Sequence, residues 1–157
     1  MHYLFGIVAE AADKKDAKNQ AQNILDDYLT NIYDWYADGA GRWRQEFEDN
    51  VIPATDSRFD ETVERLIRYQ KSEYEECRKM IKDFDFYDKL YHTGESEHLS
   101  DGTYYLEKWA NYVSGAPMTS SYIFDISHCT SRITSKQRER YMQRPEEYYL
   151  VLFDIHN

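Results

Sequence analysis

The sequence predicts an α+β protein with a small antiparallel or mixed sheet covered by three to four helices. Strand patterns lie at both ends of the chain, and helical patterns lie between them. Residues 2–10 are apolar on both alternating faces, as in a central strand, and residues 148–155 form a strongly apolar closing strand. We expect the helices on one face, in an arrangement compatible with a ferredoxin-like fold carrying a helical insertion. No linker and no internal repeat interrupts the pattern, so residues 1–157 are expected to form a single domain.

The remaining elements follow from apolar spacing. Residues 13–31 carry apolar positions at helical intervals after Asp13, an N-cap residue. Residues 57–84 show the longest apolar stripe, with i,i+4 charge pairs on the outer surface. Shorter helices are predicted at 101–113 and 135–143. A strand is predicted at 121–127.

The composition is that of a globular protein without a membrane span. The chain has 157 residues, of which 41% are hydrophobic and 31% charged, which is typical of a globular domain with its own core. No stretch reaches the apolar length of a membrane span and the start lacks a signal-peptide pattern, so we expect a cytoplasmic protein that does not bind membranes. Cys77 and Cys129 match no metal or redox spacing, and the helical stripe predicts that Cys77 is buried. We expect neither a cofactor nor a metal.

The charge distribution favours a protein partner. The formal net charge is −10; residues 1–107 hold 24 acidic and 13 basic side chains, whereas residues 108–157 hold 5 acidic and 6 basic ones. Such a field disfavours direct nucleic-acid binding and favours a basic partner that itself handles nucleic acid. The chain also holds 15 Tyr and 3 Trp, the residue types that anchor interfaces. The candidate partner-binding residues are acidic or aromatic and lie on or just after the long helix: Glu61, Glu64, Tyr69, Glu73, Glu76, Asp83, Asp85, Tyr87 and Asp88.

Residues 33–43 form the most unusual segment, in which aromatic side chains flank a Gly-x-Gly turn. One interpretation is a hairpin whose Trp35 and Trp43 pack together across the turn. The alternative is a pocket for a small ligand or nucleotide, or an enzyme site, with Arg42 binding an anionic group and a tryptophan stacking on a base. Trp35, Tyr36, Arg42 and Trp43 are the candidate ligand-binding residues. A cleft that combined Arg42 with a histidine and a carboxylate would favour this alternative.

The stretch D-W-Y-x-x-G-x-G-R-W resembles one found in small uncharacterised bacteriophage proteins, where it also follows a strand and a helix. The matching residues are Asp34, Trp35, Tyr36, Gly39, Gly41, Arg42 and Trp43. The resemblance covers the first ~45 residues and implies a phage origin, with the host cytoplasm as the site of action. It implies no catalytic residue. Combined with the acidic charge, it suggests an inhibitor of a host nucleic-acid-binding defence system, of the anti-CRISPR or DNA-mimic type.

Two features near the C-terminal end bear on chemistry. Asp125 and His128 are placed to share one face of a turn after a strand, beside Cys129. A basic cluster could meet phosphate or an acidic surface; it contains Arg132, Lys136, Arg138, Arg140 and Arg144. None of the five histidines forms a metal-ligand pair with another, and we assign no catalytic residue from the sequence.

Overall fold

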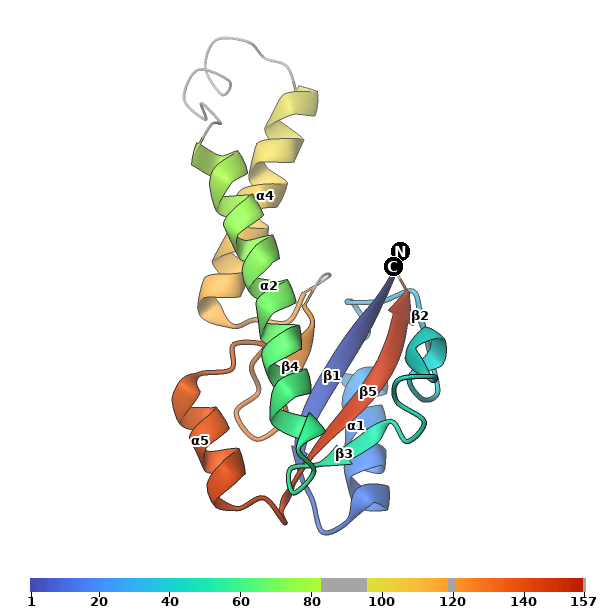
Figure 1. Cartoon of the computed structure of the whole chain (residues 1–157). Coiled ribbons are helices and arrows are strands. Elements are labelled where there is room, and N and C mark those ends of the chain that lie inside the picture. Colours follow the sequence, from blue (N-terminus) through green and yellow to red (C-terminus); the bar gives the residue numbers. More distant parts are fainter. Residues whose placement is uncertain (83–95, 119–120, 157) are drawn as a thin grey trace.

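A five-stranded mixed sheet forms the centre of the protein. The computed structural model describes residues 1–82, 96–118 and 121–156 (Figure 1). Strand β1 (His2–Glu10) pairs along its full length with antiparallel β5 (Tyr148–His156) and on its other edge with parallel β4 (Ile123–Asp125). The free edge of β5 is shared by β2 (Trp35–Ala37) at one end and β3 (Val51–Pro53) at the other.

Helices cover both faces of this sheet. Helix α1 (Lys14–Asp27) packs on one face, and α2 (Arg58–Lys82) packs on the other, where α5 (Ser135–Gln143) adds Tyr141 to the core. Helix α4 (Ser96–Ser114) packs against α2, and the two helices project beyond the sheet as a hairpin (Figure 1). We call this projecting pair, the second half of α2 with α4, the arm.

The α+β class, with both terminal strands in the sheet, is confirmed. The expectation of helices on one face is wrong, and the ferredoxin-like arrangement, with its helices segregated on one face, is not adopted. The physical reason lies in β1, whose Phe5 and Ile7 face α1 while Leu4 and Val8 face α2, all at most 2% exposed. A strand that is apolar on both faces needs a cover on each.

The predicted core position of Cys77 is confirmed, because the residue is 1% exposed. The hairpin interpretation of residues 33–43 is wrong: β2 pairs with β5, and Gly41–Trp43 form a 3₁₀ turn in place of a second extended segment. Strand β3 was not foreseen, because it has three residues and ends in a proline. None of the described helices combines the length and the apolar character needed to cross a bilayer.

Candidate functional site

A row of three rings crosses the end of the sheet. In the strand register His156 of β5 stands between His2 of β1 and Trp35 of β2. The Trp35 indole stacks on the His156 imidazole, with ring centroids 5.2 Å apart and planes 10° from parallel. His2 meets both rings edge-on, at 5.2 Å from Trp35 and 4.9 Å from His156. Cross-strand pairing therefore fixes the indole against two imidazoles.

Asp154 supplies a buried carboxylate beside this row. It lies two residues before His156, so its side chain is on the same face of β5, and it is 3% exposed. One carboxylate oxygen lies 2.9 Å from Nδ1 of His2, and the other accepts the backbone N–H of Arg42 at 3.0 Å. Because an ionised carboxylate only accepts, Nδ1 of His2 carries the proton in this contact, which leaves Nε2 as the second polar atom of the ring.

In the Gly-x-Gly turn, Gly41 allows the backbone to approach the Asp154 carboxylate closely. Gly41 has a φ of +48°, and a Cβ built on it would lie 2.8 Å from Cγ of Asp154 and closer still to two other atoms of that side chain. A side chain at this position is therefore excluded by both conformation and contact. Gly41 thus brings the backbone N–H of Arg42 onto the buried acid.

These groups line one open pocket of about 580 Å³. Its lining includes Trp35, Arg42, Arg44 and Gln45, with His2 and Asp154 at the sheet end. Within the described parts of the chain, neither the Arg42 nor the Arg44 guanidinium forms an ion pair, and both residues are exposed. Trp35 is 46% exposed although one face is stacked on His156. The pocket therefore combines two unneutralised cations, an exposed aromatic surface and an oriented imidazole.

The four predicted ligand-binding residues divide into two pairs. Trp35 and Arg42 line the pocket. Tyr36 points to the opposite face of β2, where its hydroxyl donates to Asp26 at 2.8 Å; burial and this carboxylate raise the pKa of Tyr36 to about 12. Trp43 packs against the core on the α2 side of the sheet.

Sequence reasoning missed His2, Asp154 and Arg44. His2 and Asp154 are 152 positions apart, and no local pattern signals that they touch. Only the pairing of β1 with β5 brings them together. The one available hint is that Asp154 interrupts an apolar strand, since a charged residue on a buried strand needs a partner.

The predicted partner-binding acids are partly neutralised within the protein. Glu64 forms an ion pair with Arg138, and Glu73 accepts from Lys108 at 2.8 Å, a lysine that is only 6% exposed. Despite its burial, the pKa of Lys108 is raised by its hydrogen bond to Glu73. Helix α2 as a whole carries six acidic and seven basic side chains, so it is not an acidic surface.

The other predicted partner-binding residues remain candidates. Glu61 and Glu76 are exposed and form no ion pair with other described residues, and Tyr69 is 42% exposed. The last four lie outside the described residues: Asp83, Asp85, Tyr87 and Asp88.

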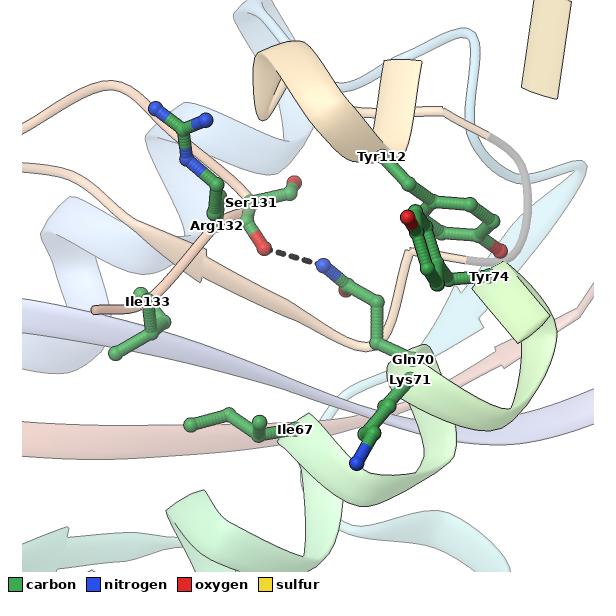
Figure 2. Close-up of a pocket in the computed structure, with 8 residues that line it drawn as sticks. All are labelled: Ile67, Gln70, Lys71, Tyr74, Tyr112, Ser131, Arg132 and Ile133. Carbon is green, nitrogen blue, oxygen red and sulfur yellow. Dashed lines mark hydrogen bonds between the residues drawn. The ribbon is translucent and has the colours of Figure 1, made fainter. Parts of the chain in front are cut away.

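A smaller hollow of about 240 Å³ lies at the base of the arm (Figure 2). The amide of Gln70 reaches from α2 to the Ser131 carbonyl at 2.5 Å, and its oxygen accepts the backbone N–H of Tyr122. Tyr74 and Tyr112 stand on one side of this bridge in Figure 2. Gln70 thus attaches the segment around Ser131 to the long helix and leaves an apolar recess beside the arm.

No protein-family model, curated protein or solved structure matches the chain. No cluster of three or more metal-ligating side chains is found in the part of the chain that the structure describes. The structure thus shows an α+β protein with an open pocket at one end of its sheet, lined by Arg42, Arg44, Trp35 and His2.

Proposed function

We propose that this protein binds a small anionic ligand that carries an aromatic ring, of the nucleotide type, in the pocket between Trp35 and Arg42. The observation that carries the proposal is the pocket lining itself: two guanidinium groups, an indole surface and the Nδ1-held imidazole of His2 in one cavity. Its volume of about 580 Å³ falls within the range of small-molecule sites.

Each group has a distinct role in this proposal. The guanidinium groups of Arg42 and Arg44 bind phosphate or carboxylate oxygens, for which arginine offers paired donors. The base stacks on the surface of Trp35 that His156 leaves open. His2 offers Nε2 as a donor or an acceptor to the ligand, since Asp154 holds the other ring nitrogen.

We predict that Arg42→Ala weakens binding of the best ligand by about 10- to 100-fold, because a charge-assisted hydrogen bond contributes about 1.5–3 kcal/mol. Binding is measured by isothermal titration calorimetry against a panel of mono-, di- and cyclic nucleotides. Trp35→Ala should also weaken binding, and should remove the ligand-dependent quenching of tryptophan fluorescence.

Arg68→Ala is the matched control, because Arg68 is exposed on α2 and makes no ion pair with another described residue. This control should bind like the unaltered protein. Equal losses in Arg42→Ala and Arg68→Ala would mean that only net charge matters, and the pocket would not be the site. Failure of every nucleotide in the panel to bind would also refute the proposal.

A second candidate function is protein–protein interaction through the arm. Four of the large apolar side chains that are at least 42% exposed lie on the arm: Met80, Tyr104, Leu106 and Val113. With the apolar recess at the base of the arm, they support a docking surface for a protein partner. A basic, nucleic-acid-binding host protein, and with it inhibition of a phage-defence system, is the form of this proposal that the net charge favours.

We predict that a tagged form of the protein captures one stoichiometric partner from a bacterial lysate, and that Met80→Ala with Leu106→Ala reduces this capture at least several-fold. Mass spectrometry identifies the partner, at low and at high salt. Met142→Ala is the matched control, since Met142 is 46% exposed but lies on α5, away from the arm. Capture that is unchanged in the double variant would exclude the arm as the docking surface.

A further inference from the structure

A second cluster of polar side chains surrounds His128, which follows strand β4. Asp125, the last residue of β4, is fully buried. Its carboxylate accepts Nδ1 of His128 at 2.8 Å and the side-chain amide of Gln137 at 3.1 Å, and it also accepts the hydroxyl of Tyr141. The expectation that Asp125 and His128 share a face of the turn is confirmed.

The turn holds His128 in a fixed orientation. Asp125 and Thr130 bond to each other through their backbones, at 2.8 and 3.3 Å, and so close the turn. The other carboxylate oxygen of Asp125 accepts the backbone N–H of His128 at 3.2 Å. Cys129 completes the turn with a φ of +49°, a conformation that is uncommon for a residue other than glycine. Both the backbone and the ring of His128 are therefore fixed by one buried acid.

His128 lies where two open cavities meet. One, of about 560 Å³, extends over α5 and includes Lys136 and Arg140; the other, of about 490 Å³, extends toward Arg132 and Cys129. The His128 side chain is about one-third exposed, and its Nδ1 makes the hydrogen bond to Asp125. Because the Nδ1–H group donates its hydrogen bond to Asp125, Nε2 is the ring atom that a ligand in either cavity can meet.

The charges around this groove are mostly positive, in a protein whose net charge is −10. Lys136 forms no ion pair with another described residue, whereas Arg140 lies 3.7 Å from Glu10 and Arg132 donates to the carbonyl of Val113. The charged and titratable groups that face His128 come from the turn, from α5, from the segment before α5 and from the end of α1: Asp125, Cys129, Lys136, Glu139, Arg140, Arg132 and Tyr28. Among the described residues that line the two cavities, Glu139 is the single acid, and Asp125 already accepts several hydrogen bonds.

We propose that the groove at His128 is a second binding site, for the phosphate group of an anionic ligand, in which Nε2 of His128 and the Lys136 ammonium bind phosphate oxygens. Asp125 acts as a positioning residue that holds the ring through Nδ1, so that Nε2 faces the ligand; the doubly protonated ring donates this Nε2–H to a phosphate oxygen. The proposal does not depend on the Arg42 pocket. That pocket includes His2, at the start of β1, whereas Asp125 pairs with Val8 near the end of β1, and the two sites share no lining residue.

The test uses the full chain labelled with ¹⁵N in its histidine rings, titrated with inorganic phosphate and with pyrophosphate. The His128 ring signals, assigned with His128→Gln, should shift to saturation. Sodium chloride at equal ionic strength should not reproduce the shift. Lys136→Ala should weaken the apparent affinity by about threefold or more. Lys15→Ala is the matched control, because Lys15 is an exposed helical lysine on α1 and should leave the titration unchanged.

Three outcomes would overturn the proposal. A shift that does not saturate, or that chloride reproduces, would indicate general screening. Equal effects of Lys136→Ala and Lys15→Ala would indicate that only net charge is sensed. A shift that disappears in Arg42→Ala while Lys136→Ala is silent would assign the bound phosphate to the first pocket. Backbone amide spectra of each variant show that the fold is retained, so none of these results can be attributed to unfolding.

Discussion

Replacing Asp125 by alanine should cost about 3–5 kcal/mol of unfolding free energy, the largest loss we expect from a single polar substitution. The substitution leaves the buried Tyr141 hydroxyl and the Gln137 amide without the acceptor that both now use. An unsatisfied buried donor retains its full desolvation cost, whereas the gain from its former hydrogen bond is lost. Burial and the Asp125 carboxylate together raise the pKa of Tyr141, because both favour the neutral phenol that donates to Asp125.

Urea denaturation followed by circular dichroism measures this loss. Asp38→Ala is the matched control, since Asp38 is an exposed acid whose ion pair with Lys18, at 2.9 Å, should contribute less than about 1 kcal/mol. The double variant with Tyr141→Phe should lose less than the sum of the two single variants, because both substitutions remove the same contact. A cost for Asp125→Ala no greater than that of Asp38→Ala would contradict the buried network.

The second large effect is expected at Gly41. Gly41→Ala should destabilise the protein by about 3 kcal/mol, of which about 1 kcal/mol comes from holding alanine at positive φ and the rest from displacing Asp154. It should also weaken ligand binding in the Arg42 pocket, because Asp154 orients both the Arg42 backbone and the His2 ring. Denaturant unfolding and the nucleotide titration described above measure the two effects.

Gly39 provides an internal comparison for this prediction. Its φ is +93°, but, its own residue and chain neighbours aside, no atom of the described residues lies within 4 Å of the position that a Cβ would take. Gly39→Ala therefore carries the backbone strain without the collision, and it should cost clearly less than Gly41→Ala. Similar costs at the two glycines would show that the approach of residue 41 to Asp154 is not what constrains the turn.

The sheet and the helices could be predicted where the pattern is long and continuous. Strand β1 and helix α5 were predicted with the bounds observed, since β1 is apolar from Tyr3 to Ala9 and Pro145 ends the pattern of α5. Strand β3 was missed because three residues carry too little periodicity. The expectation of helices on one face was wrong although the pattern of β1, apolar on both faces, indicates a cover on each.

The candidate site was only half predictable for a similar reason. The sequence indicated Trp35 and Arg42 because both lie in the segment where aromatic side chains flank the Gly-x-Gly turn. His2 and Asp154 are ordinary in their own segments and gain meaning only through the pairing of the first strand with the last. The sequence predicted that the acids of α2 are available to a partner. In the structure, however, Glu64 pairs with Arg138 of α5 and Glu73 pairs with Lys108 of α4.

The length of α2 has a consequence for how this protein can vary. Four of its five buried side chains, Phe59, Thr62, Val63 and Leu66, lie in its first half against the sheet, and only Cys77 is buried in the second half. The first half is therefore tied to the core that both polar sites are built on, while the second half depends mainly on α4. Substitutions on the outer surface of the arm are thus largely uncoupled from the sheet. One end of a single helix can change its binding preferences over generations while the other end keeps the scaffold constant.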